Sequence, residues 1–264
     1  MKIAMISTYP DEKCAIARYS YYLTKELKKY IDVITIGNPG SNCDYHINLK
    51  SLRLKSEFKK IIKKENLDLL HFQYMPTIFG KYVYTINYGL LNSLKLKIPT
   101  IVTLQEVQTS KEGNFLNKFN QAFLFLTQKK MISLTNKIIV HAPSQKKFLE
   151  DIYHKNNIEC IYHFILPDLL GMKLEEVHKK KDENLLFFGI ISPNKGIEYA
   201  IRAMKYLPDY KLNIVGNVFE QNEEYKDFLL DEIKKNNLKN VKTVFGWIPE
   251  EDKDKYYKEA DLVV

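Results

Sequence analysis

The stretch LLFFGIISPNKGIEYAIRAM, residues 185–204, decides the fold of the second half of the chain. Its first residues are apolar and end in a glycine, which predicts a buried strand, and later apolar positions repeat at helical spacing. Lys195 and Gly196 lie between the two, and we expect them to open the helix. Both are unfavourable in a first helical turn. A bound anion would account for them, because free N–H groups and a lysine would converge on it; an ordinary solvated lysine is the alternative.

Strand and helix patterns alternate on both sides of this stretch. Apolar runs of strand length lie at 2–7, 32–37, 67–72, 100–105, 137–142, 158–164, 185–189, 211–216, 241–246 and 261–264. Helical patterns lie between most of them, at 16–29, 52–65, 115–134 and 144–154 among others. This alternation predicts parallel sheets with helices on both faces.

The alternation is interrupted once. Residues 169–183 show no strand pattern and contain a charged run, which predicts a linker. We therefore expect an α/β chain with two doubly wound, Rossmann-like domains, over residues 1–168 and 184–264. The last strand of the second domain stops at Val264. A buried parallel strand with no helix after it leaves one sheet face uncovered, so we expect a C-terminally truncated piece of a longer protein.

Composition narrows the class of protein. Of the 264 residues, 45% are hydrophobic, which is enough to build hydrophobic cores. The sequence contains three cysteines, at positions 14, 43 and 160. Their number and spacing argue against disulfides and a zinc site and favour a reducing cytoplasm. No signal peptide is recognisable, and no apolar run is as long as a membrane span. We expect a cytoplasmic protein that lies at most on the inner face of a membrane.

Charge is unevenly distributed along the chain. Residues 1–168 hold 24 basic and 14 acidic residues, whereas residues 169–264 hold 16 and 18. A basic half attracts phosphate groups, nucleic acid or anionic lipid, although a solvated lysine-rich surface explains it equally well. No nucleic-acid-binding module is recognisable. The helices expected at 52–65 and 115–134 mix apolar and basic residues, which favours an anionic membrane surface as partner.

Ligands of parallel sheets bind at the carboxyl ends of the strands, so polar residues there are candidates for chemistry. His71 lies near the end of the third strand pattern, and Glu106 follows the fourth and could act as an acid, a base or a hydroxyl binder. An ordinary structural role is the alternative for each. His141 and His163 also end strand patterns, but spacing does not bring them together with His71, so we predict no metal site. No dinucleotide or Walker A motif occurs.

Glycines close three strand patterns of the second domain. They are Gly189, Gly216 and Gly246. Each alone is compatible with a simple turn, because glycine permits a tight turn as well as a close ligand. Three in register, one of them followed by Lys195 and Gly196, favour a nucleotide that lies across the strand ends.

Several stretches of the sequence resemble a known family. Residues 185–217 and NVKTVFGWIPEEDKDKYYKEADLVV at 240–264 closely resemble the donor domain of GT-B glycosyltransferases, above all glycosyltransferase family 4. The first half is similar in HFQYMPTIFG (71–80), PTIVTLQ (99–105), KIIVHAPSQKKFL (137–149) and CAIARY (14–19). The resemblance covers essentially the whole chain. It implies a retaining, metal-independent enzyme that needs no cofactor and moves a sugar from a nucleotide diphosphate sugar to a hydroxyl acceptor.

The resemblance also assigns roles to residues. It implies that Lys195 binds the donor diphosphate, together with the strand-end glycines and Gly196, and that the loop after Gly246, with Trp247, runs along the base. It implies that the first loop, from Ala15 to Arg18, approaches phosphate or acceptor. The acceptor would be a glycan or a lipid-linked sugar, as in polysaccharide synthesis for a cell envelope.

Several positions depart from the family. Ala15 stands where the first loop usually has a glycine, and Phe164 follows His163 where a glycine usually does. Ile190 stands where an arginine usually follows the first glycine, and Gln105 stands where a histidine usually ends the strand. The family's acidic motif would lie beyond Val264, so we expect this piece alone to be inactive. A glycosyltransferase-like binding subunit with weakened catalysis is the main alternative, and an epimerase of the same fold is a further one.

Overall fold

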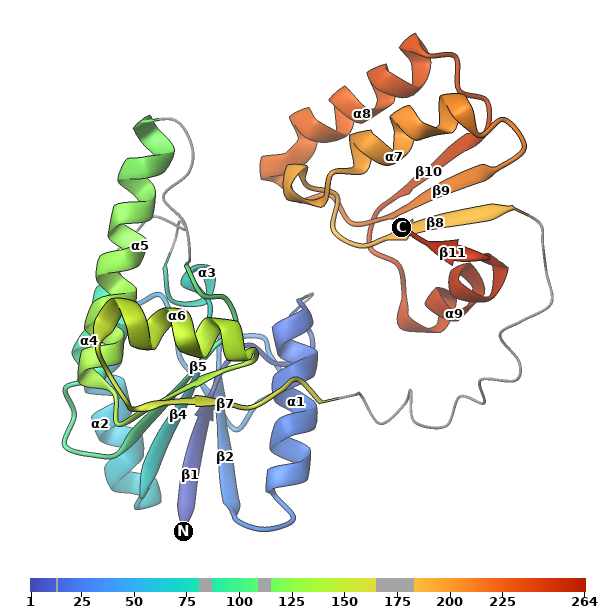
Figure 1. The fold of residues 1–264 in the computed structure, drawn as a ribbon. Helices are drawn as coiled ribbons and strands as arrows, with labels where there is room; N and C mark the ends of the chain where they lie inside the picture. The colour runs from blue at the N-terminus through green and yellow to red at the C-terminus, as the bar shows by residue number, and fades with distance from the viewer. Residues whose placement is uncertain (13, 81–86, 109–114, 165–182) are drawn as a thin grey trace. The chain divides into compact units, whose positions relative to one another are not determined.

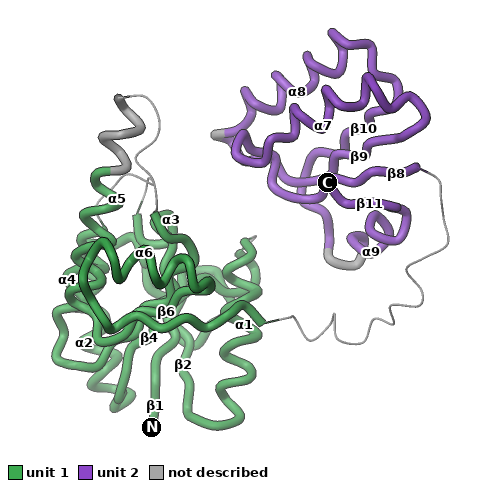
Figure 2. The backbone as a smooth tube through the Cα atoms, viewed as in Figure 1, with its two compact units in different colours: residues 1–170 green, residues 171–264 purple. Residues whose placement is uncertain are grey.

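A computed structural model describes residues 1–12, 14–80, 87–108, 115–164 and 183–264. The chain divides into two compact units, Met1–Leu170 and Gly171–Val264 (Figure 2). The linker expected at 169–183 lies outside the described residues except for Glu183. Within the described residues, no helix is both long and apolar enough to cross a membrane.

The first unit is built on a parallel sheet of seven strands in the order β3-β2-β1-β4-β5-β6-β7 (Figure 1). The strands are β1 Lys2–Ile6, β2 Asp32–Gly37, β3 Tyr45–His46, β4 Leu69–Tyr74, β5 Thr100–Leu104, β6 Lys137–Val140 and β7 Ile158–Cys160. The order changes direction between β1 and β4, and such a switch point opens a crevice at the carboxyl edge of the sheet. The two-residue β3 carries too little pattern to be predicted, and β7 is shorter than expected.

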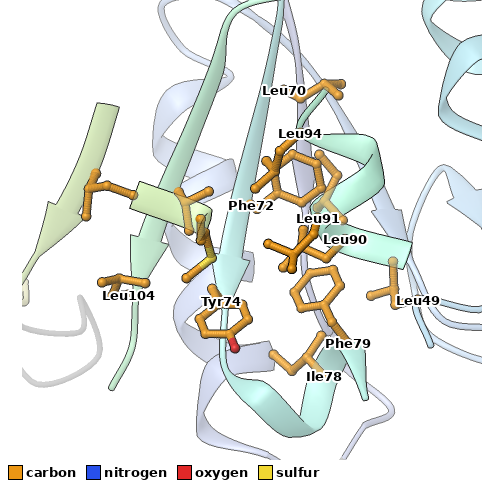
Figure 3. Packing of buried hydrophobic residues seen from close by; sticks show 14 of the residues in the cluster. Leu49, Leu70, Phe72, Tyr74, Ile78, Phe79, Leu90, Leu91, Leu94 and Leu104 are labelled. Atoms are coloured by element: carbon orange, nitrogen blue, oxygen red, sulfur yellow. The ribbon is translucent and has the colours of Figure 1, made fainter. Parts of the chain in front are cut away.

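Helices cover both faces of this sheet, because alternate residues of each strand point to opposite faces. They are α1 Ala15–Leu27, α2 Leu54–Glu65, α3 Pro76–Phe79, α4 Tyr88–Ser93, α5 Phe115–Leu134 and α6 Pro143–Tyr153. Ile3 and Met5 of β1 pack against α1 on one face. The larger core lies on the other face, where Leu90 of α4 and Phe79 of α3 pack around Phe72 of β4 (Figure 3). The ring of Phe58 of α2 meets the Phe72 ring edge-on.

The second unit is a smaller parallel sheet in the order β10-β9-β8-β11 (Figure 1). Its elements are β8 Asn184–Phe188, α7 Ile197–Ala203, β9 Lys211–Gly216, α8 Glu223–Lys235, β10 Val241–Phe245, α9 Glu250–Glu259 and β11 Leu262–Val263. Leu185 and Phe187 face the core with α7 and α8. Phe188 points to the other face, where its ring meets Tyr256 and Tyr257 of α9. The two doubly wound sheets confirm the predicted fold class.

The last strand, β11, is only partly covered, as expected for a strand that no helix follows. Leu262 and Val263 are 57% and 53% exposed. They pair only with β8, through Leu185 and Leu186, so β11 is an edge of the sheet. The apolar edge of the second sheet is therefore open.

Candidate functional site

The three strand-end glycines of the second unit lie side by side. Gly246 N donates to Gly216 O at 2.9 Å, and Gly189 N donates to Val215 O at 3.0 Å, so the glycines continue the ladder past the strand ends. Gly216 has φ +154°, and an ideal Cβ there would lie 1.6 Å from Gly189 O. Around Gly246 such a Cβ would meet nothing within 4 Å. The fold requires the middle glycine, whereas the space beside Gly246 is open.

Lys195 and Gly196 do not form the first turn of a helix, which corrects the sequence expectation. Lys195 ends a short 3-10 turn, Pro193–Lys195, and α7 begins only at Ile197. Gly196 has φ +65°, a left-handed conformation that glycine adopts at little cost. The backbone therefore explains Gly196 without a bound anion. The acidic residue of the first turn is Glu198, which complements the helix N-terminus.

Lys195 nevertheless remains an exposed cation on a loop fixed to the strand ends. Ile191 N donates to Asn217 O at 2.9 Å, and Asn222 Nδ2 donates to Ile191 O at 3.0 Å. The loop from β8 to Lys195 is thus tied to the end of β9. Lys195 forms no ion pair with any described residue. A positive charge free of internal partners and close to a glycine-lined edge is suited to bind an anion.

Two large side chains follow the outer glycines at this edge. Ile190 comes directly after Gly189 and is exposed, so the position next to the first glycine carries no charge. Trp247 follows Gly246 and is also exposed, with the Lys253 ammonium 5.9 Å from its ring centroid. An exposed indole ring offers a flat apolar surface to a ligand.

In the first unit, His71 lies inside β4 and not at its end. The strand runs two residues further than the sequence pattern predicts, to Tyr74, so His71 does not lie at the edge of the sheet. It is 7% exposed, and Nε2 lies 2.8 Å from Thr103 Oγ1 of β5. Burial lowers the pKa of His71 to about 4, so the ring is neutral at pH 7.

A line of polar side chains extends from His71 toward the carboxyl edge. Gln73 is fully buried, and Gln105 donates from Nε2 to its Oε1 at 2.8 Å. Gln105 is one of the positions at which the sequence departs from the resemblance, and its amide is held by this contact. Glu106, the next residue, is exposed and accepts a hydrogen bond from Gln108 Nε2 at 3.3 Å. Glu106 can therefore meet a substrate directly, whereas His71 cannot.

The first loop leads into α1, where Ala15 is the first residue and Arg18 follows one turn later. Cys14 caps this helix: its Sγ accepts a hydrogen bond from Ala17 N at 3.3 Å and lies 3.1 Å from Thr8 Oγ1. Ala15 is exposed, and the Arg18 guanidinium lies 5.9 Å from the ring centroid of Tyr22. The sequence analysis missed this cap because serine, threonine, aspartate and asparagine are the usual N-cap residues.

The sequence analysis also missed a cluster of rings next to α1. His141 and His163 stack with ring centroids 3.7 Å apart, and Tyr19 of α1 contacts both edge-on. The ring of Phe164 stacks on Tyr19 at 4.8 Å. Two of the three strand-end histidines thus come together. Among the described residues, no group of three potential ligands could hold a metal ion.

Comparison with known proteins gives one family and several related folds. Residues 173–264 match the family model described as glycosyl transferases group 1. A comparison with curated proteins finds no match. Among solved structures, sucrose-phosphate synthase from Thermosynechococcus elongatus has a TM-score of 0.72 at 16% identity, over 100% of this chain and 74% of that one.

Two further solved structures have a similar fold. HepE from Anabaena, solved with UDP and glucose, has a TM-score of 0.67 at 15% identity, over 100% of this chain and 73% of its own. A glycosyltransferase from Rickettsia africae has a TM-score of 0.66 at 15% identity, over 99% of this chain and 72% of its own. The chain as a whole thus has the GT-B fold of these structures, and its residues 173–264 resemble the glycosyl transferases group 1 family.

Proposed function

We propose that the protein is a retaining glycosyltransferase that moves a sugar from a nucleotide diphosphate sugar to a hydroxyl group of a glycan or a lipid-linked acceptor. The observation that carries this proposal is the glycine-lined edge of the second unit, with the free cation of Lys195 on the adjoining loop, in a region that matches a glycosyltransferase family. Products of this class serve glycan or glycolipid synthesis, such as that of a cell envelope.

In this reaction the acceptor hydroxyl forms a bond to the anomeric carbon of the sugar, and the bond from that carbon to the phosphate oxygen breaks. A base takes up the hydroxyl proton, and the nucleoside diphosphate departs with additional negative charge. Stabilising that charge is the main task of the donor side, and we assign it to Lys195 and the backbone N–H groups beside Gly189 and Gly246, without a metal ion. Trp247 is assigned to the base or the adjoining sugar.

We assign the acceptor side to the first unit. Glu106 is exposed at the carboxyl edge, so it is our candidate for contact with the acceptor hydroxyl, as hydrogen-bond acceptor or base. His71 is buried and neutral, so its proposed part is that of a positioning residue that acts through Thr103. Ala15 and Arg18, at the start of α1, are our candidates for contact with phosphate or acceptor.

The cellular setting is part of the proposal. The three cysteines are free, which fits a reducing cytoplasm. A lipid-linked acceptor would require the protein to reach the cytoplasmic face of a membrane, and the basic first unit suits an anionic one.

The test is donor turnover by the natural full-length protein. Purified protein is incubated with UDP-, GDP- and ADP-sugars, each carrying a labelled sugar, and with membrane lipid or glycan extracts, and label in the acceptor fraction is followed. The proposal would be supported if the wild-type protein transfers label from one class of donor and the Lys195→Ala variant does not. Label released only as free sugar or as an isomerised nucleotide sugar would contradict it.

A second candidate is a binding subunit with weakened catalysis. Two observations favour it: exposed Ile190 leaves the first glycine without a neighbouring cation, and the Gln105 amide is engaged with Gln73. Such a subunit would bind a nucleoside diphosphate without turning over any donor. Donor binding by calorimetry together with the absence of transfer in the assay above would select it.

A further inference from the structure

The positive charge of the first unit is concentrated at one helix. Between Lys50 and Lys64 the chain carries seven basic residues and one acidic residue. α2 turns Leu54, Phe58 and Ile61 into the core, so most of its basic side chains point outward. Such a density of one charge creates a local field that attracts anions.

At the start of α2 this charge surrounds a hollow of about 300 Å³. Its lining consists of Leu52, Arg53, Lys55, Ser56, Lys59 and Asn92. Three of these six residues are cations and none is acidic. Arg53, Lys55 and Lys59 form no ion pair with any described residue, because the neighbouring Glu57 pairs with Lys60 at 3.6 Å. The hollow thus combines uncompensated charge with the neutral hydrogen-bonding groups of a serine and an asparagine.

Large apolar side chains stand beside these cations. Leu52 lines the hollow and is 73% exposed, and Tyr88, the first residue of α4, is 58% exposed. The two belong to one surface, because α4 packs on the turn that carries Leu52: an ideal Cβ on Gly89 would lie 2.2 Å from Ser51 O. Exposed apolar side chains among cations are the composition of surfaces that lie in a bilayer interface.

The segment that leads into this surface starts at the carboxyl edge of the first sheet. Leu49, just before this surface, donates from N to Asn38 Oδ1 at 3.1 Å, and Asn38 follows the end of β2. Asn38 in turn donates from Nδ2 to Glu12 Oε2 of the first loop at 3.2 Å. A membrane bound here would therefore lie beside the edge to which we assign the acceptor.

We propose that the hollow binds the phosphate headgroup of an anionic phospholipid, with Leu52 and Tyr88 inserted at the bilayer interface. A free phosphate would use the cations alone, whereas the exposed leucine and tyrosine fit a lipid surface. The inference rests on the proposed function for its biological purpose, since it names the surface that brings the protein to a lipid-linked acceptor. Vesicle binding requires no donor, so it can fail or succeed independently of sugar transfer.

The experiment measures co-sedimentation of the 264-residue chain with vesicles of phosphatidylcholine, alone or mixed with phosphatidylglycerol. We expect binding to the mixed vesicles only, weakening as salt rises. A triple variant, Arg53→Gln with Lys55→Gln and Lys59→Gln, should lose on the order of a hundredfold in binding, since each cation near an anionic surface contributes roughly fivefold. The control triple, Lys25→Gln with Lys147→Gln and Lys155→Gln, removes the same charge at exposed positions elsewhere on the first unit and should retain most of the binding.

A second pair of variants tests insertion. Leu52→Ser with Tyr88→Ser should weaken binding at least about tenfold, because apolar surface is no longer buried in lipid. Its control, Ile152→Ser with Tyr30→Ser, removes similar apolar side chains at other exposed positions of the first unit. Circular dichroism of all variants checks that they are folded.

Three outcomes would overturn the proposal. Equal losses for the two charge triples would show general attraction without a site in the hollow. Binding unaffected by Leu52→Ser with Tyr88→Ser would remove the insertion. Absence of vesicle binding, with inorganic phosphate protecting the lysines of the hollow from acetylation, would assign the site to a soluble anion.

Discussion

The carbonyl oxygen of Gly189 occupies the space in which a side chain on Gly216 would begin, since an ideal Cβ at Gly216 would lie 1.6 Å from it. The ends of β8 and β9 therefore approach backbone to backbone. This contact fixes the loop that leads to Lys195. The backbone contact therefore requires a glycine at position 216, which also lies in the proposed donor site.

Replacement of Gly216 by alanine should destabilise the second unit strongly. The new Cβ would meet backbone, which cannot rotate away, and φ +154° is strained for alanine. We expect a loss of about 3 kcal/mol or more in the free energy of unfolding. Urea unfolding followed by the fluorescence of Trp247, the single tryptophan of the chain, reports on this unit.

Gly189→Ala is the matched control. A Cβ at Gly189 would come no nearer than 3.7 Å to the Phe187 ring, an ordinary contact, so we expect a change within about 1 kcal/mol. Equal unfolding midpoints for the two variants would contradict the assignment of the close contact to Gly216.

Lys195→Ala should weaken nucleotide binding without changing stability. An exposed lysine usually contributes within about 0.5 kcal/mol to folding. Loss of a charge-assisted contact to a diphosphate should cost roughly 1.5–3 kcal/mol, about ten- to a hundredfold in affinity, and Ile190 offers no second cation to compensate. Calorimetry with UDP, GDP and ADP on the natural full-length protein measures the effect, and thermal unfolding without ligand measures stability.

Lys205→Ala is the control, since Lys205 is an exposed lysine on the turn that follows α7. It should change neither quantity. Unchanged affinity in Lys195→Ala would make Lys195 an ordinary surface residue, and a large fall in its melting temperature would make it structural. Either result would refute the phosphate assignment.

The fold could be predicted because the apolar runs are long and regular. The alternation of strand and helix patterns gave ten of the strands near their observed positions, as at β9, Lys211–Gly216. The short elements β3 and α4 were not predicted, because segments of two to six residues carry too little periodicity. Gly196 was misinterpreted because a left-handed φ cannot be recognised from residue type alone: the pattern indicated a helix start, and the backbone placed a turn before it.

The candidate site was only partly predictable because its contacts are tertiary. The glycines could be aligned from the sequence, since parallel strands of similar length end at one edge. The stacking of His141 on His163 joins the end of β6 to the segment after β7, and no local pattern encodes it. The burial of His71 was missed for a related reason: its partner Thr103 lies on the next strand, 32 residues away.

The open edge at β11 should cause self-association of the 264-residue chain. A strand that is paired on one side only, with exposed Leu262 and Val263, is a template for pairing with another chain. Val263→Lys should lower the association constant at least about tenfold, because a charge on the edge opposes pairing. Sedimentation velocity over a range of concentrations measures this. Tyr206→Lys, which adds a lysine at an exposed position outside the edge, is the control and should leave the association constant unchanged. A wild-type chain that stays monomeric would contradict the prediction.

His71 should make the stability of the first unit depend on pH. Burial depresses its pKa to about 4, against about 6.5 in the unfolded chain. The stability that this neutral histidine provides is therefore complete above pH 6.5 and is lost as the pH falls toward 4, because only the unfolded state takes up the proton. The loss between pH 7 and pH 5 should be about 2 kcal/mol.

Urea unfolding at the two pH values, followed by circular dichroism, measures this loss. In His71→Gln the amide can still meet Thr103, but nothing titrates, so the pH dependence should become flatter by about the same 2 kcal/mol. His154→Asn is the control for the loss of a histidine as such: His154 is exposed at the end of α6 with φ +51°, which asparagine tolerates. If His71→Gln keeps the full wild-type pH dependence, the destabilisation arises elsewhere, and the ring of His71 is accessible to protons in the folded state.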